Sequence, residues 1–234
     1  MDERFAETVR NIAGQDWTEE HGRNLMADVG GLSRVGERYV ALGDSYTIGE
    51  GVAAAESWPS LLTADLRERG IPIELVANPS VTGWTTAQLI EHELPIFEAS
   101  RPTFATLLIG VNDWVQGVPA GYFRERLALI VERVQATLPD RRRLVLVTIP
   151  DFSVTQAGAT YSRGRDIASG IAGFNDIILS TAESASLEVV DIFPLSRRLT
   201  GPDYVVADQL HPSAAAYTEW EALILPIALT LLTR

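Results

Sequence analysis

The chain has 234 residues, of which 31 are acidic and 19 basic, giving a formal net charge of −12 at pH 7. With 46% hydrophobic and 21% charged residues it differs from disordered proteins, and its length suits one main domain with a sizeable core. The acidic balance argues against binding to nucleic acid or anionic membrane, and the absence of cysteine excludes disulfides, thiolate catalysis and Cys-ligated metals.

The first 37 residues differ from the rest in being polar and rich in helix formers. We expect residues 1–37 to form a helical appendage, with helices over Asp2–Ile12 and from Thr18 to about Val29, and residues 38–234 to form the main domain. The segment Met1–Gly14 lacks the apolar region of a secretory signal, so the sequence predicts a cytoplasmic location.

From Arg38 onward, short apolar and β-branched runs alternate with longer amphipathic stretches. The expected strands are Tyr39–Leu42, Ile73–Ala77, Phe104–Ile109, Leu144–Ile149 and Leu187–Asp191. The expected helices are Trp58–Arg69, Thr86–Ala99, Ala120–Thr137, Arg165–Ala185 and Ser213–Leu231. This alternation predicts an α/β fold with an open parallel sheet covered on both faces, in which ligands bind beyond the carboxyl ends of the strands.

Cap residues support several of these boundaries. Ser57 and Thr85 stand where N-caps are expected, and Gly70 stands just past the end of a predicted helix. The longest apolar stretch, Ala222–Leu232, is too short to span a bilayer and contains Pro226. It predicts a buried terminal helix and no membrane span.

Polar residues follow the first predicted strand in the run Gly43-Asp44-Ser45-Tyr46-Thr47. A serine at a sharp strand-to-helix turn is exposed to substrate, and its own N–H can donate to a developing oxyanion. Ser45 is therefore a candidate nucleophile, although these residue types also form ordinary turns. The run is not the G-x-S-x-G nucleophile elbow, because Thr47 occupies the final glycine position.

His211 is the strongest candidate base among three histidines, since His21 lies in the N-terminal segment and His92 on the polar side of a predicted helix. Asp208 precedes it by three residues, a spacing that lets a carboxylate hold one ring nitrogen and leaves the other free to take a proton. The alternative is a helix N-terminus in which Asp208 is simply a favourable acidic residue.

Gly83 and Asn112 lie near the ends of two other predicted strands. A backbone N–H and a side-chain amide can both donate to an oxyanion, although either residue is also common in loops. Their occurrence at separate strand ends favours a shared site.

The segments Gly43-Asp44-Ser45, Asn78 through Gly83, Gly110-x-Asn112-Asp113 and Asp208-x-x-His211 resemble, in order and spacing, the four blocks of the SGNH (GDSL-type) hydrolases. The resemblance spans about 39–217. It implies a flavodoxin-like, three-layer α/β/α sandwich with a five-stranded parallel sheet. It also implies that Ser45 is the nucleophile, His211 the base and Asp208 its orienting partner, with an oxyanion hole formed by Ser45, Gly83 and Asn112.

Two features depart from this family or compete with it. Tyr46 stands where the family motif has leucine, which leaves the chemistry intact and reshapes the mouth of the pocket. The run Gly49–Ala54 fits a G-x-G-x-x-A dinucleotide motif, but it does not follow the strand directly. With no H-E-x-x-H motif and scattered histidines, we expect neither metal nor cofactor.

Trp84 and Trp114 each follow a candidate oxyanion-hole residue, so both are candidates for lining the cleft and binding substrate, with core packing as the alternative. The long connection over residues 150–164 contains Phe152 and Tyr161 and suits a lid or binding loop.

These features predict a serine hydrolase that cleaves small-molecule carboxylic esters through an acyl-enzyme on Ser45. The alternatives are acyl transfer to a sugar or alcohol, and a non-catalytic binding module on the same fold.

Overall fold

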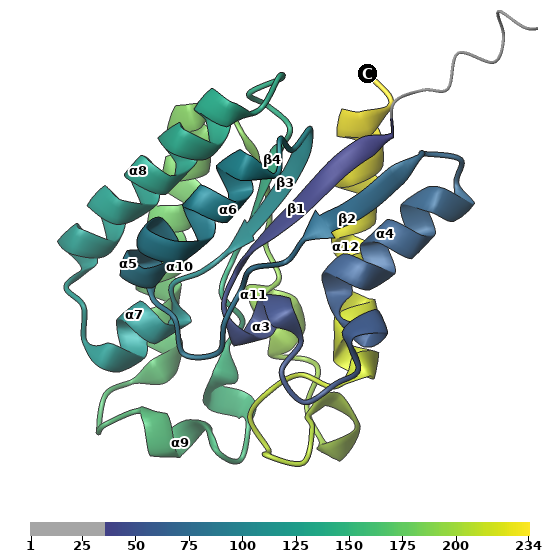
Figure 1. Ribbon diagram of the computed structural model, residues 1–234. Helices are drawn as coiled ribbons and strands as arrows, with labels where there is room; N and C mark the ends of the chain where they lie inside the picture. The colour runs from purple at the N-terminus through teal and green to yellow at the C-terminus, as the bar shows by residue number, and fades with distance from the viewer. Residues whose placement is uncertain (1–35) are drawn as a thin grey trace, which may run out of the picture. The chain divides into compact units, whose positions relative to one another are not determined.

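A computed structural model of the chain describes residues 36–234 (Figure 1). The two helices expected before residue 30 lie outside the described residues. The described part of the chain begins at Gly36, and β1 begins at Glu37.

The centre of the fold is a five-stranded parallel sheet, as predicted. Its strands lie in the order β2-β1-β3-β4-β5, and every neighbouring pair is parallel. Their bounds are β1 Glu37–Gly43, β2 Ile73–Ala77, β3 Phe104–Leu108, β4 Leu144–Val147 and β5 Glu188–Val190. Strand β3 is buried at every position, because both faces of the sheet are covered by helices.

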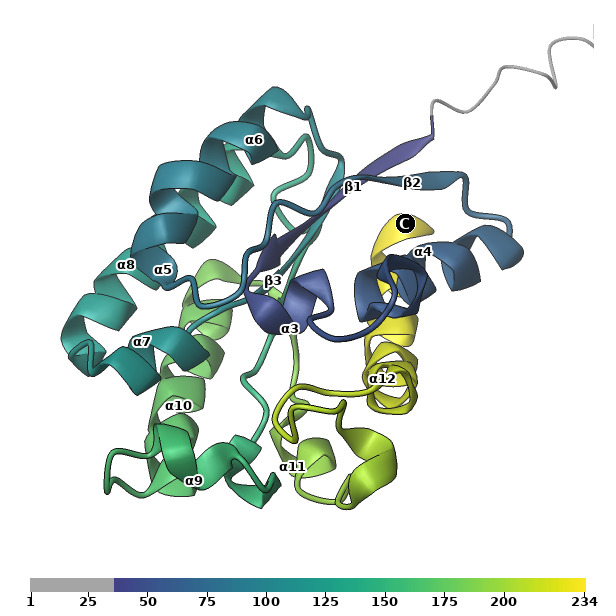
Figure 2. The same ribbon diagram turned by 60° about the horizontal axis from the view of Figure 1, so that its bottom comes forward.

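Helices cover both faces of this sheet and give the three layers that the family resemblance implies (Figures 1 and 2). One face carries α4 (Trp58–Glu68) and α12 (Ala214–Leu232), and the other carries α6 (Leu94–Ala99), α8 (Ala120–Thr137) and α10 (Ile167–Ala185). The shorter helices are α3 Ser45–Ile48, α5 Thr86–Gln88, α7 Val111–Gln116, α9 Gly158–Tyr161 and α11 Phe193–Ser196.

The apolar helix α12 packs against α4. By length and composition alone it also passes for a membrane-spanning helix, but half of its apolar window is buried inside the fold. Its buried residues include Tyr217, Trp220 and Ile224, which are 0–2% exposed. One side of α12 is therefore part of the hydrophobic core.

The predicted helix over Thr86–Ala99 is present, but its middle is a π-helical turn at Leu89–Glu93. The backbone N–H of Leu94 donates to the carbonyl of Leu89, five residues back. Pro95 follows, and a proline inside an α-helix clashes with the carbonyl four residues earlier. A wider turn before Pro95 relieves that clash and changes the direction in which Glu93 points.

All three predicted cap residues lie at the expected helix ends. Thr85 caps α5, since its hydroxyl accepts from the N–H of Ala87. Gly70 has φ +82° just past α4. Ser57 is the N-cap residue of α4, although its hydroxyl donates to the carbonyl of Ala54 and accepts no helix N–H.

Candidate active site

Ser45 is the first residue of α3, at the carboxyl end of β1. The turn is tight, because a Cβ at position 43 would overlap the carbonyl of Leu108 and the side chain of Thr47. Asp44 caps the helix by accepting the N–H of Tyr46 on Oδ1 at 3.1 Å. These contacts fix Ser45 at the start of a helix, with its side chain at a cavity.

Two buried carboxyl groups lie behind this turn. Glu93, from the π-helical turn, accepts the N–H of Gly43 on Oε2 at 3.0 Å and is fully buried. Burial raises the pKa of Glu93 to about 8, against the effect of that hydrogen bond, and the charge of Asp44 adds to the rise. Burial likewise raises the pKa of Asp44 to about 8. Both groups favour the protonated form in the folded protein.

Asp208 and His211 form a compact turn before α12. Asp208 Oδ2 lies 2.6 Å from His211 Nδ1, and Oδ1 accepts the backbone N–H groups of Leu210 at 2.8 Å and His211 at 2.9 Å. Gln209 has φ +61°, which brings the two side chains to the same side of the turn. The structure thus contradicts the alternative that Asp208 serves only a helix N-terminus.

The environment of Asp208 keeps it ionised. Partial burial raises its pKa, but the hydrogen bonds from the His211 ring and from two backbone N–H groups outweigh burial, so the pKa falls below its ordinary value. An ionised Asp208 holds the proton of the imidazole on Nδ1 and leaves Nε2 free to accept another.

Hydrogen-bond donors converge on the opposite side of the site. Within residues 36–234, the backbone N–H groups of Ser45 and Gly83 donate to no protein acceptor. Gly83 has φ +85°, and a Cβ there would meet only open space. Asn112 lines the same cavity, and its amide donates to the carbonyl of Trp84 at 3.0 Å, which leaves its second N–H available.

A cavity of about 140 Å³ joins these groups. It is lined by Ser45, Tyr46, Thr82, Gly83, Val111, Asn112, Val115, Phe152, Tyr161, Leu210 and His211. Phe152 and Tyr161 come from the long connection after β4, so this connection does contribute to the wall. Ser45 and His211 share the cavity but form no hydrogen bond with each other in the described part of the chain, a common situation before substrate binds.

Neither tryptophan is among the residues that line this cavity, and Trp114 takes the alternative role of core packing. Trp114 is 5% exposed and packs under Arg165, whose guanidinium lies 3.9 Å from the ring centroid, and against Phe152. Trp84 turns away to pack against His92, with ring centroids 5.1 Å apart. Trp114 lies on α7 two residues after Asn112, so the two side chains leave the helix in different directions.

Sequence reasoning assigned no role to Asp113, which proves to join two elements of the site. Its carboxylate accepts the backbone N–H of Thr86 at 2.8 Å and the Thr86 hydroxyl at 2.6 Å. Asp113 is fully buried on α7, next to Asn112, and Thr86 begins α5, just after Gly83. The contact therefore sets the spacing of the two candidate oxyanion donors.

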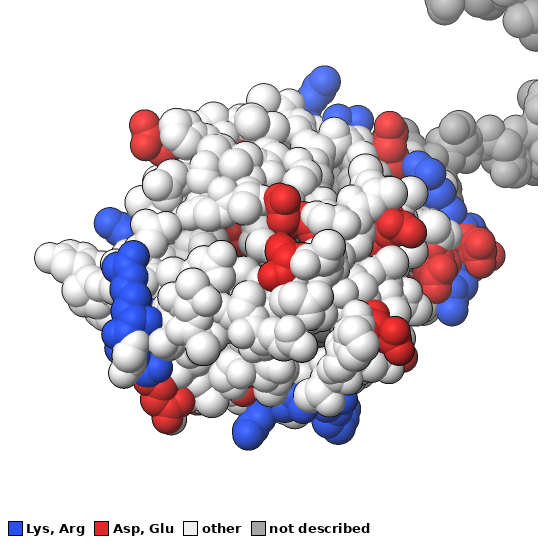
Figure 3. Space-filling model, turned by 90° about the horizontal axis from the view of Figure 1, so that it is seen from below, with Lys and Arg blue, Asp and Glu red and all other residues white. Residues whose placement is uncertain are grey.

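The face at the carboxyl ends of the strands carries few charged side chains near its centre, and those are acidic (Figure 3). Acidic side chains at this face disfavour an anionic substrate relative to a neutral ester.

The comparisons with known proteins identify the family of the chain. The profile of the GDSL-like lipase/acylhydrolase family matches residues 41–218. An arylesterase of Vibrio mimicus is 26% identical over 184 residues, which cover 79% of this chain and 84% of that protein. The chain therefore belongs to the GDSL-like lipase/acylhydrolase (SGNH) family, and it is an esterase or acylhydrolase.

Solved structures share the fold at lower identity. The crystal structure of TesA is similar with a TM-score of 0.66 and 22% identity, covering 84% of this chain and 99% of that chain. The psychrotrophic esterase EstA from Pseudoalteromonas sp., inhibited by monoethylphosphonate, has a TM-score of 0.65 and 21% identity, covering 85% of this chain and all of that chain.

Proposed function

We propose that this protein hydrolyses carboxylic esters of short acyl chains through a covalent acyl-enzyme on Ser45. The observation that carries the proposal is that one cavity is lined by Ser45, by His211 with Asp208 at its Nδ1, and by Gly83 and Asn112, each with an N–H available to an oxyanion. A volume of about 140 Å³ suits an acyl group of a few carbon atoms.

In the first half-reaction, His211 Nε2 takes the proton of Ser45 while Oγ attacks the ester carbonyl carbon. The carbonyl oxygen becomes an oxyanion, held by the N–H groups of Ser45 and Gly83 and by the Asn112 amide. Collapse breaks the bond to the alcohol oxygen, which leaves with the proton from His211. Asp208 stabilises the imidazolium that forms in between.

In the second half-reaction, water replaces the alcohol. His211 takes a proton from the water as its oxygen attacks the acyl carbon, and returns that proton to Ser45 Oγ as the acid departs. The same donors hold the second oxyanion. The enzyme ends unchanged, with one ester and one water converted to one acid and one alcohol.

Steady-state hydrolysis of p-nitrophenyl acetate tests the proposal, with Ser45→Ala compared with Ser80→Ala. Ser80 is a matched control, because it too is a buried serine near a strand end, and its hydroxyl has no partner among the described residues. Ser45→Ala is expected to lower kcat by about 10⁴-fold or more, whereas Ser80→Ala retains the parent rate within a few-fold. Equal activity of parent and Ser45→Ala would overturn the proposal.

A further inference from the structure

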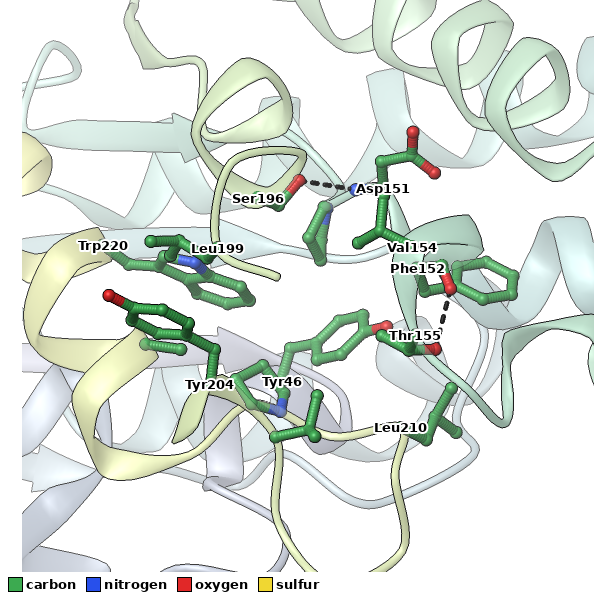
Figure 4. A pocket seen from close by; sticks show the side chains of 14 residues that line it. Tyr46, Asp151, Phe152, Val154, Thr155, Ser196, Leu199, Tyr204, Leu210 and Trp220 are labelled. Carbon is green, nitrogen blue, oxygen red and sulfur yellow. Dashed lines mark hydrogen bonds between the residues drawn. The ribbon is translucent and has the colours of Figure 1, made fainter. Parts of the chain in front are cut away.

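A second cavity of about 30 Å³ lies beside the first, with room for about one water molecule. Figure 4 shows its walls, which are mainly apolar and include Leu199, Tyr204 and Trp220. Tyr46, Phe152 and Leu210 line both cavities. The two spaces are therefore neighbours that share a wall.

Tyr46 is the residue of this shared wall whose ring contacts one residue of each cavity. Its ring packs edge-on against the His211 imidazole, which lines the first cavity, with centroids 5.9 Å apart. The same ring packs edge-on against the Trp220 indole, which lines the second, also with centroids 5.9 Å apart. Tyr46 is only 3% exposed.

Hydrogen bonds hold the backbone of Tyr46 in place, and packing holds its ring. Its N–H donates to Asp44 Oδ1 at 3.1 Å, and its carbonyl accepts the indole N–H of Trp58 at 3.1 Å. Because the Tyr46 ring is packed between two other rings on a fixed backbone, a change of its rotamer is costly. The ring therefore blocks the passage between the two cavities.

The position of His211 tells which part of an ester approaches this wall. The histidine that protonates the departing alcohol must lie within hydrogen-bond reach of the alcohol oxygen. Leu210 and Pro212, the chain neighbours of His211, both line the second cavity. A chain that continues from the alcohol oxygen past His211 therefore runs into the ring of Tyr46, with the second cavity behind it.

We propose that Tyr46 is a specificity-determining residue that limits the length of the ester's alcohol group, and that the second cavity is an extension of the alcohol subsite closed by its ring. This inference rests on the proposed function, because it assigns a subsite to the same reaction. Leucine in place of Tyr46 would remove the ring and join the two cavities.

The test compares the parent with Tyr46→Leu on acetate esters of ethanol, butanol and hexanol, with acetic acid release followed by pH-stat. All three esters give the same acetyl-enzyme, so differences in kcat/KM between them report on the alcohol group alone. Burying one methylene is worth roughly a fourfold gain. If the joined cavity buries two of the four methylenes by which hexyl exceeds ethyl, Tyr46→Leu raises the hexyl-to-ethyl ratio of kcat/KM about 15-fold.

Tyr46→Phe is the matched control, since it keeps the ring and removes only the hydroxyl; its hexyl-to-ethyl ratio should equal that of the parent. Tyr46→Met also removes the ring, and it serves as a second variant with joined cavities should Tyr46→Leu fold poorly; we call both opened variants. Ratios of kcat/KM do not depend on the fraction of active enzyme. An unchanged ratio in both opened variants, or a gain confined to longer acyl chains in a p-nitrophenyl ester series, would overturn the inference. A parent inactive on every ester would contradict the proposed function instead.

Discussion

Glu93 makes the stability of the turn beneath Ser45 depend on pH. The side chain is fully buried, and its pKa rises from the ordinary 4.5 to about 8. The folded protein therefore holds this proton more tightly than the unfolded chain does. Its contribution to stability is complete below pH 4.5 and is lost as the pH rises through about 8.

The difference between 4.5 and 8 corresponds to about 5 kcal/mol of unfolding free energy as an upper limit. Glu93→Gln removes this dependence and keeps an oxygen that accepts the N–H of Gly43. From pH 5 to pH 9 the unfolding free energy of the parent should thus fall by several kcal/mol more than that of the variant. The pKa of Asp44 is also raised to about 8, and this group titrates in both proteins. The unfolding free energy of Glu93→Gln should therefore still fall with pH, but less steeply than that of the parent.

Urea unfolding followed by tryptophan fluorescence at pH 5, 7 and 9 measures this difference. Glu132→Gln is the matched control, because Glu132 is exposed on α8 and its substitution makes the same chemical change away from the site. Its unfolding free energies should follow those of the parent at all three pH values. Parallel pH profiles for the parent and Glu93→Gln would refute the reasoning.

Three further substitutions test the site. Asn112→Ala should lower kcat/KM for p-nitrophenyl acetate about a hundredfold, because one oxyanion donor is lost. The lost hydrogen bond to the Trp84 carbonyl should lower the unfolding free energy by only about 1 kcal/mol; a parent-like rate would remove Asn112 from the oxyanion hole. Asp208→Asn should lower kcat on the order of a thousandfold or more, since the ring loses its charged partner at 2.6 Å; a loss below tenfold would contradict that role. Asp113→Ala should lower the unfolding free energy measured in urea by about 2 to 4 kcal/mol, because the N–H and hydroxyl of Thr86 stay buried without an acceptor. An unchanged unfolding free energy would show that the contact is dispensable.

The sheet and the positions of the main polar residues could be predicted because both follow from local patterns. Apolar runs such as Phe104–Leu108 identify strands, and parallel strands bring the residues after them to one edge. Ser45, Gly83 and Asn112 accordingly meet in one cavity, and Asp208 contacts His211 within a single turn.

The features that sequence reasoning missed depend on contacts between distant segments. Glu93 meets Gly43 across 50 residues, through a π-helical turn that helical periodicity does not indicate. The sequence leaves Trp114 open to cleft lining or core packing, because its contacts with Arg165 and Phe152 come from a connection without a regular pattern.

The most direct test of the central claim is intact-mass spectrometry after treatment with a fluorophosphonate, on the parent and on Ser45→Ala. A serine activated by His211 attacks phosphorus and displaces fluoride, so the parent should gain the mass of one phosphonyl group at Ser45 and Ser45→Ala should gain none. An adduct of the same stoichiometry on Ser45→Ala, or none on the folded parent, would contradict the assignment of Ser45 as the nucleophile.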